Sequence, residues 1–276
     1  MKKFTALVAG LALTTGWAMA DTIQIEPELP QPVYGGTPLD YWGENLETPS
    51  YRPIPPIVAP AGSSNVALNK SVTTSAGAPS MGSLDMITNG MKDAGDEHVV
   101  EIEPGHQWVQ IDLGEETDIY AIVMWHFHSS ERVYFDVAVQ VGADADMTQG
   151  VETVFNNDHD NSAGMGVGSD QEYVESYRGR IIRINETLPV DANLVGRTLA
   201  ADVISEESRA VVGTTSAELT EELIAAISEA GVDEVKVLRE NGVRGRFVRL
   251  YSAGNTSDDA NHYIEVEVYG KSASAR

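Results

Sequence analysis

Apolar and polar residues alternate along the chain after Asn65, and the alternation is clearest in three segments. The apolar positions in these segments are Val109, Ile111 and Leu113; then Val133, Phe135, Val137, Val139 and Val141; and finally Ile264, Val266 and Val268. Successive side chains of a strand point to opposite faces, so this pattern predicts antiparallel strands with one buried face. Stretches rich in Gly, Asn and Asp at 142–146 and 156–168 indicate turns or loops between the strands.

One segment, between about residues 185 and 240, departs from this pattern. Thr220 is suited to cap a helix, Glu221 and Glu222 follow it in the first turn, and Gly231 can end the helix in the left-handed conformation. We expect a short helix near 221–230 and then a strand over 234–238. The chain is therefore predicted to be mainly β, with a small α/β insertion. Residues 194–237 are also similar to a short module of the large subunits of bacterial RNA polymerase.

The first 20 residues have the features of a signal peptide. Lys2 and Lys3 form a positive start, an apolar stretch too short to span a bilayer follows, and Ala18 and Ala20 supply small residues at the cleavage positions. No later apolar run approaches membrane-spanning length, so we expect no membrane span. The segment predicts an exported, bacterial protein, either secreted or periplasmic.

Residues 21–64 are predicted to form a Pro-rich extended arm or linker. Nine of the 12 prolines lie between Pro27 and Pro60, and proline favours extended backbone. The arm also carries aromatic residues, which either pack onto the main domain or dock a protein partner. These residues are Tyr34, Tyr41, Trp42 and Tyr51.

Charge and composition narrow the classes of partner and chemistry. The chain has 18 basic and 42 acidic residues, for a net charge of −24, so a nucleic acid or an anionic membrane is not an expected partner. It has no cysteine, which excludes disulfides, thiolate metal sites and thiol catalysis. None of the usual catalytic motifs is present, such as a Gly-x-Ser-x-Gly elbow or His-Glu-x-x-His, so we expect no enzyme activity.

Three segments in order resemble the discoidin, or coagulation-factor 5/8 type C, family, which is galactose-binding-like and includes many carbohydrate-binding modules. They are residues 65–77, 107–125 and 244–270. The resemblance implies an antiparallel jelly-roll β-sandwich over 65–270, interrupted by the insertion at 185–240 and followed by a tail at 271–276. It also implies that ligands bind to loops at one end of the sandwich.

The same resemblance implies a structural Ca²⁺, held between a loop and a glutamate near the C-terminus. Asn89, Asp93 and Asp96 lie in the matching loop and offer hard oxygen ligands, and the matching glutamate is Glu265. The family often has Asp where this chain has Asn89, which removes one formal charge from the site. The alternative is a solvated acidic turn.

His126 and His128 are two residues apart, which places them on one face of a strand. Such a pair either shares a metal with a third ligand from residues 156–162 or lies on a polar outer face with local hydrogen bonds. The Gly-rich stretch at residues 156–170 matches neither a calcium-binding loop nor a dinucleotide-binding motif. We interpret it as a long ordered loop that can line a ligand site.

We therefore predict a non-catalytic binding module that recognises a carbohydrate or another extracellular or cell-surface ligand. Polar residues of the predicted loops are the candidate ligand contacts: His126, His128, Arg132, Asp158, His159 and Asn261. If these side chains only hold the loops together, their loss affects stability and not affinity. The alternative function is a structural or interaction subunit of an exported assembly, with protein contacts made by the Pro-rich arm and the insertion.

Overall fold

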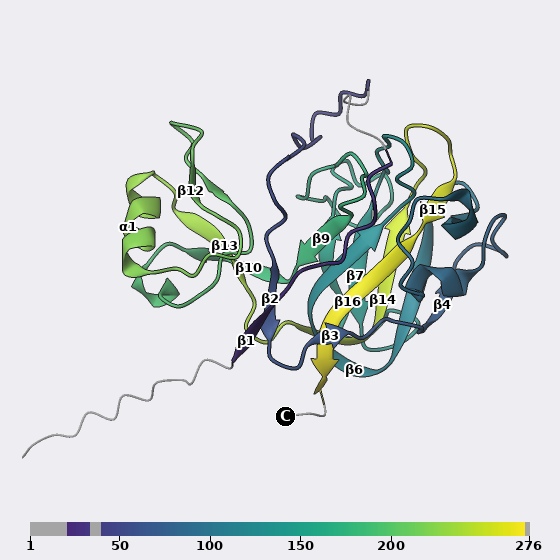
Figure 1. Ribbon diagram of the computed structural model, residues 1–276, viewed down its shortest axis with the longest axis horizontal. Helices are drawn as coiled ribbons and strands as arrows, with labels where there is room; N and C mark the ends of the chain where they lie inside the picture. The colour runs from purple at the N-terminus through teal and green to yellow at the C-terminus, as the bar shows by residue number, and fades with distance from the viewer. Residues whose placement is uncertain (1–20, 34–39, 274–276) are drawn as a thin grey trace, which may run out of the picture.

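Most regular structure in the computed structural model is antiparallel β-sheet, and the structure describes residues 21–33 and 40–273 (Figure 1). The predicted signal peptide, Tyr34 and residues 274–276 of the predicted tail lie outside the described residues. The strands of the largest sheet are β3 (Ser64–Asn65), β4 (Ser71–Thr74), β6 (Gln107–Trp125), β7 (Ala138–Gly142), β8 (Glu152–Asn156), β9 (Arg180–Arg183), β14 (Val243–Ser252) and β16 (Glu265–Ser272).

Strand β6 joins the two layers of the sandwich. Its first half pairs with β4 and β14, and its second half pairs with β9 and β16. Between the halves, Gly114 has φ +88°, a backbone conformation that favours glycine, and the regular pairing of β6 with β14 is interrupted between Asp112 and Thr117. Strand β6 is strongly curved (Figure 1). Apolar side chains of both halves meet in the core, among them Val109, Ile111, Ile122 and Met124, all without exposed surface. The predicted antiparallel β-sandwich is confirmed.

Shorter elements close the ends of the sandwich. They are η1 (Leu84–Thr88), η2 (Asp96–His98), β5 (Val100–Ile102) and β15 (Asn261–Tyr263), of which β5 and β15 pair with each other. The predicted strand over 133–141 is regular only from Ala138 onward. Asp136 has φ +51°, which is incompatible with a continuous strand, so the alternation before it belongs to a loop.

The N-terminal arm packs on the outer face of β6 and β16. Its strands β1 (Thr22–Ile25) and β2 (Ile57–Pro60) pair with each other. Ile57 lies in an apolar cluster with Val123 and Trp125, and Leu29 packs against that cluster. Two of the arm's aromatic rings remain outside: Trp42 is 86% exposed and Tyr51 is 82% exposed. The arm therefore covers the sandwich with its apolar residues and leaves these rings free.

The insertion forms a smaller lobe with its own apolar core (Figure 1). Its elements are β10 (Asn185–Pro189), η3 (Ala192–Leu194), β11 (Val203–Ile204), β12 (Val211–Gly213), α1 (Glu221–Glu229) and β13 (Glu234–Leu238). The backbone N–H of Arg239 donates to the carbonyl of Ile184 at 3.0 Å, so the lobe leaves and rejoins the sandwich at neighbouring points.

Local signals for the helix of the insertion were sufficient to predict it. The Thr220 side chain accepts a hydrogen bond from the backbone N–H of Leu223 at 3.2 Å, and Gly231 takes a φ of +75° just after the helix. The predicted helix and the strand after it are confirmed. Among the described residues, this helix and the shorter helical turns are all too short and too polar to cross a membrane.

Candidate functional site

The six predicted ligand contacts come from residues 126–132, 156–162 and 252–262, which lie near one another at one end of the sandwich. Arg132 bonds Asp258 at 3.0 Å, which joins the first and third of these loops. Residues 133–137, which follow the first loop, contact the other two: Ala253 N–H donates to the carbonyl of Phe135 at 2.9 Å, and Asn157 N–H donates to the carbonyl of Val137 at 3.0 Å. The loop residues themselves are mostly interior. His126, His128, Asp158 and Asn261 have no exposed surface, whereas Arg132 is half-buried and His159 is exposed.

Four of the six predicted ligand contacts therefore need correction, because side chains without exposed surface cannot touch a ligand in this conformation. His126, His128, Asp158 and Asn261 are the four. The Asn261 amide shows the reason: its oxygen accepts from Ser252 Oγ and Gly254 N at 2.8 Å, and its nitrogen donates to two backbone carbonyls at 2.9 Å. It ties loops together.

The two histidines also have separate internal partners. His126 Nδ1 lies 3.0 Å from Glu175 Oε2, and its ring stacks on Tyr134 with a centroid distance of 4.2 Å. His128 Nε2 lies 2.9 Å from the carbonyl of Lys92. The prediction of a polar outer face is wrong, because both rings are interior. Neither histidine belongs to a group of three described side chains close enough to share a metal. Among the described residues, no hydrogen bond or ion pair joins any two of the six predicted contacts.

A group of carboxylates lies at the same end. Oxygens of Asp136, Asp158 and Asp160 all lie within 4.8 Å of one another. Burial and the neighbouring Asp158 raise the pKa of Asp136. Asp158 is already bonded, since its two oxygens accept from the backbone N–H groups of Ser162 at 2.9 Å and Ala163 at 3.0 Å. The group offers oxygen ligands of the kind that hard cations prefer.

The loop expected to hold Ca²⁺ contacts the expected glutamate. Glu265 is buried, and its Oε2 accepts from the backbone N–H of Gly90 at 3.0 Å, while its Oε1 has no hydrogen-bond partner in the part of the chain that the structure describes. Burial raises the pKa of Glu265 to about 8. Asn89 is directly adjacent, whereas Asp93 and Asp96 are exposed. The backbone of Asn89 lies near the Glu265 carboxylate, and a buried carboxylate oxygen without an internal partner is a suitable cation ligand. Among the described residues, no hydrogen bond joins Asp93 or Asp96 to Glu265.

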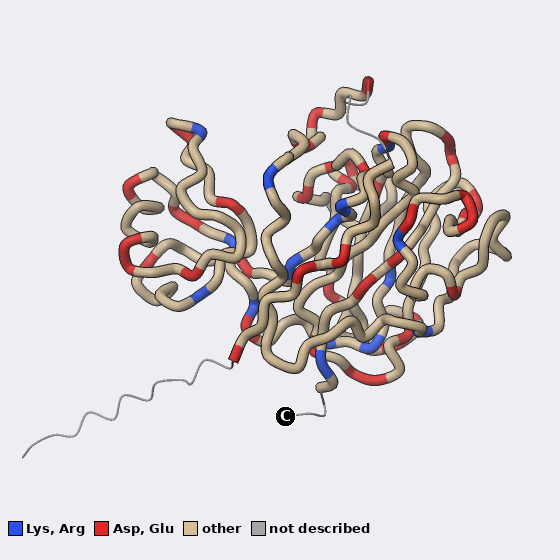
Figure 2. Tube along the Cα trace, viewed as in Figure 1, with Lys and Arg blue, Asp and Glu red and all other residues tan. Residues whose placement is uncertain are grey.

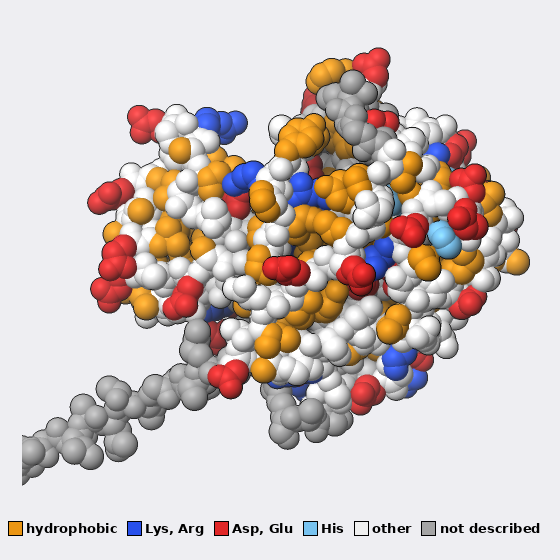
Figure 3. Space-filling view, in the orientation of Figure 1, with side chains coloured by type: hydrophobic (Ala, Val, Ile, Leu, Met, Phe, Trp, Pro, Cys, Tyr) orange, Lys and Arg blue, Asp and Glu red, His pale blue; other side chains and the backbone are white. Residues whose placement is uncertain are grey.

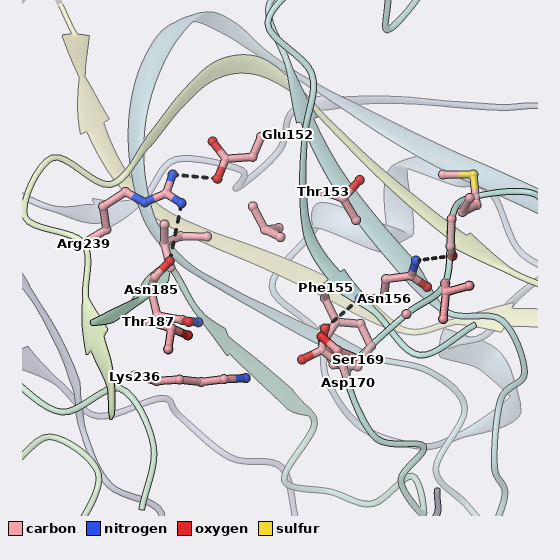
Figure 4. A pocket seen from close by; sticks show the side chains of 16 residues that line it. Glu152, Thr153, Phe155, Asn156, Ser169, Asp170, Asn185, Thr187, Lys236 and Arg239 are labelled. Atoms are coloured by element: carbon pink, nitrogen blue, oxygen red, sulfur yellow. Dashed lines mark hydrogen bonds and ion pairs between the residues drawn. The ribbon is translucent and has the colours of Figure 1, made fainter. Parts of the chain in front are cut away.

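A cavity of about 410 Å³ lies between the sandwich and the insertion (Figure 4). Its wall on the sandwich side consists of β8, residues 165–170 and Ile184, and its wall on the insertion side consists of Asn185, Thr187, Lys236 and Arg239. The loop at 165–170 is part of the Gly-rich stretch that the sequence marked as a possible ligand-site wall. The insertion side was not predicted, because its position opposite β8 brings together residues far apart in the chain, such as Arg239 and Glu152.

Polar groups converge on this cavity from both walls. Arg239 bonds Glu152 across it at 2.6 Å. Lys236 and Thr187 are direct partners in the β10–β13 ladder, so their side chains stand side by side, and both are exposed. Among the described residues, Lys236 has no carboxylate within 4 Å and its ammonium is free to bind. Ser169 and Asp170 lie on the opposite wall (Figure 4).

Comparison with known proteins gives distant structural neighbours only. No family model matches the chain, and no curated protein matches it. A family 89 glycoside hydrolase from Clostridium perfringens is 13% identical with a TM-score of 0.41; the match covers 76% of this chain and 15% of the hydrolase. The chain thus spans a small part of that enzyme's length.

Two other neighbours are binding modules of similar size to the matched region. A chitosan-binding module of a chitosanase/glucanase from Paenibacillus sp. IK-5 is 13% identical, with a TM-score of 0.38, and 75% of this chain and 98% of the module are covered. A fucose-binding module from Streptococcus pneumoniae is 15% identical, with a TM-score of 0.37, and 75% and 97% are covered. At these values the neighbours' ligands do not transfer to this chain.

Proposed function

We propose that the protein is an exported, non-catalytic module that binds a carbohydrate in the cavity of Figure 4. The observation that carries this proposal is the cavity's size and lining. Its volume of about 410 Å³ lies within the range of roughly 300–1,000 Å³ that is usual for small-molecule sites. Sugar hydroxyls need paired donors and acceptors, and the two walls supply both.

Individual groups have suitable roles. The Lys236 ammonium can donate to a ligand without first breaking an ion pair with another described residue. The Thr187 hydroxyl can donate and accept, and Asp170 and Ser169 face these two residues from the other wall. The Arg239–Glu152 ion pair fixes one end of the cavity. No nucleophile with an activating base is needed for this function, because recognition alone uses these groups.

A glycan array probed with the protein from residue 21 onward tests the proposal, followed by affinity measurements on the sugar that binds. Thr187→Val and Lys236→Ala should each weaken binding about tenfold, the effect of losing roughly 1.4 kcal/mol of hydrogen bonding. Lys271→Ala on β16 is the control, because it removes the same charge outside the cavity. An array without binding, or unchanged affinity in both variants, would contradict the proposal.

The structural Ca²⁺ is a second part of the proposal, with Glu265 and Asn89 as its ligands and Asp93 and Asp96 at the rim. The supporting observation is the unpartnered, buried Oε1 of Glu265. A bound cation would stabilise the folded state by about 2.7 kcal/mol at a hundredfold excess over Kd. EDTA should then lower the melting temperature, and Ca²⁺ should restore it. An unchanged melt would rule out this part alone.

The alternative function, a subunit of an exported assembly, is favoured by one observation on the arm. Trp42 and Tyr51 remain more than four-fifths exposed although the rest of the arm packs on the sandwich. Exposed aromatic side chains are common anchors of protein interfaces. Recovery of a partner in a pull-down that is lost with Trp42→Ala, together with an empty glycan array, would favour this alternative.

A further inference from the structure

A second cavity, of about 560 Å³, lies where three distant parts of the chain meet. Residues 50–55 of the arm form one side, residues 178–183 around the start of β9 form another, and Asp202, Thr214 and Thr215 of the insertion close it. It shares no lining residue with the cavity of Figure 4, so conclusions about the two cavities are independent.

This cavity concentrates positive charge in an acidic protein. The chain has 18 basic and 42 acidic residues, and Asp and Glu are spread over both lobes (Figure 2). In contrast, the lining contains four arginines and one carboxylate: Arg52, Arg178, Arg180, Arg183 and Asp202. Basic side chains are visible between the smaller lobe and the sandwich in the space-filling view (Figure 3).

Two of these arginines have no carboxylate partner. Arg178 donates to the backbone carbonyls of Ser50 at 2.7 Å and Arg52 at 2.6 Å, and Arg183 donates to the carbonyl of Pro55 at 2.6 Å. Within the described part of the chain, neither has a carboxylate oxygen within 4 Å. The Nε of Arg183 is buried and has no hydrogen-bond partner among residues 21–33 and 40–273, and burial lowers the pKa of Arg183 to about 10.

The acids near the cavity do not balance these charges. Asp202 is occupied by Arg52 and by the Thr215 backbone N–H at 2.8 Å. Arg180 is paired with Glu47 at 2.8 Å and also lies over the ring of Tyr173 at 3.8 Å. Among the described residues, Arg178 and Arg183 therefore have no carboxylate in direct contact, and Asp202 acts on Arg183 only from a longer distance. Partly buried cations are stable mainly when an anion accompanies them.

We propose that this cavity binds a compact oxyanion, the carboxylate or sulfate group of an acidic ligand, between Arg178 and Arg183. A guanidinium has five N–H donors, and the backbone carbonyls occupy only some of those on each arginine. Its planar fork matches the paired oxygens of a carboxylate or a sulfate. Because the protein is negatively charged overall, it does not attract anions non-specifically, so saturable anion binding requires a specific site such as this one.

The test is calorimetric titration of the protein from residue 21 onward with sodium sulfate and, separately, with sodium acetate, at constant ionic strength in chloride. We expect saturable binding of at least one anion, and the comparison of the two shows whether a tetrahedral or a planar group is preferred. Arg178→Gln should weaken that binding at least about tenfold. Arg209→Gln, an exposed arginine of the insertion outside the cavity, should leave it unchanged.

A second variant, expected to bind the anion more tightly, keeps the test valid even if Arg178→Gln misfolds. Asp202→Asn retains the acceptor for the Thr215 N–H and removes the carboxylate of Asp202 from the lining, so it should tighten anion binding. If Arg178→Gln does not fold, tighter anion binding by Asp202→Asn supports the proposal, and unchanged anion binding by Asp202→Asn contradicts it. The proposal is wrong if neither anion binds saturably, or if Asp202→Asn and a folded Arg178→Gln both match the unsubstituted protein.

Discussion

At the scale of single residues, Glu265 should make stability depend on pH. Burial raises its pKa to about 8, above its ordinary value of 4.5, so the folded protein holds a proton that the unfolded chain releases over this range. The stabilising contribution is present below the lower value and is lost as pH rises through the higher one. In EDTA, the free energy of unfolding should fall by roughly 3 kcal/mol from pH 5 to pH 8 on this account.

Glu265→Gln should remove this fall, because glutamine keeps the acceptor for Gly90 and does not titrate. Urea unfolding at several pH values measures the difference between the two proteins. Glu207→Gln, at an exposed acid of the insertion, is the matched control and should keep the slope of the unsubstituted protein. Equal slopes with and without Glu265 would show that its burial has no such effect.

Asn261 should matter for stability and not for ligand affinity. Its amide makes four hydrogen bonds, two of them fully buried, that hold three segments of the loop end together. Asn261→Ala should lower the free energy of unfolding by about 1–3 kcal/mol because partners are left unsatisfied. His159→Ala, at an exposed position, should change it by less than about 0.5 kcal/mol. Thermal melts of both variants measure this difference, and a stable Asn261→Ala protein that binds sugar less tightly would contradict it.

At the scale of elements, the arm should contribute to stability through Ile57. This residue is 1% exposed in the apolar cluster that covers β6 and β16. Ile57→Ala should cost about 2–5 kcal/mol, whereas Val58→Ala, on the other face of β2, should cost less than about 1 kcal/mol. Chemical denaturation gives both values. Similar, small losses in the two variants would mean that the arm is only loosely attached.

The sequence predicts elements better than sites, for a physical reason. The cap at Thr220, the terminating Gly231 and the alternation in β6 and β16 act over a few residues, so they are readable locally. The burial of the predicted ligand contacts is set by partners far along the chain. Glu175, the partner of His126, is 49 residues away. A polar loop residue gives the same local signal whether it contacts a ligand or holds loops together, so the loop end was predicted, but four of the six side chains chosen there are buried.

The cavities show the same limit, because part of each lining comes from residues far apart in the chain. Residues 165–170 were marked in advance because a long Gly-rich loop is visible in the sequence, but the opposite wall comes from the insertion. Lys236 of that wall belongs to β13, an alternating strand whose sequence alone does not indicate a ligand site. Likewise, Arg178 and Arg183 are close in the sequence, but their missing carboxylates become visible only once the arm is in place. Sites formed between two lobes therefore cannot be predicted from local sequence patterns.

At the scale of the whole molecule, the insertion should be separable from the sandwich. It has its own apolar core, and its two ends meet where Arg239 bonds the backbone of Ile184 at 3.0 Å. Replacing residues 186–238 with two glycines should therefore leave a cooperatively folded sandwich, because the main core loses none of its buried side chains from this range. The same deletion removes one wall of each cavity, so carbohydrate and anion binding should both be lost.

Ile227→Ala distinguishes a separable lobe from one on which the sandwich depends. Ile227 has no exposed surface and lies in the core of the insertion alone, and its truncation should cost that lobe about 2–5 kcal/mol. Calorimetry should then show an early transition of the lobe, with the transition of the sandwich at the temperature found for the deletion variant. Global unfolding of the deletion variant, or a single lowered transition in Ile227→Ala, would mean that the two lobes fold as one unit. In that case the arm and insertion would stabilise the sandwich as well as shape its cavities.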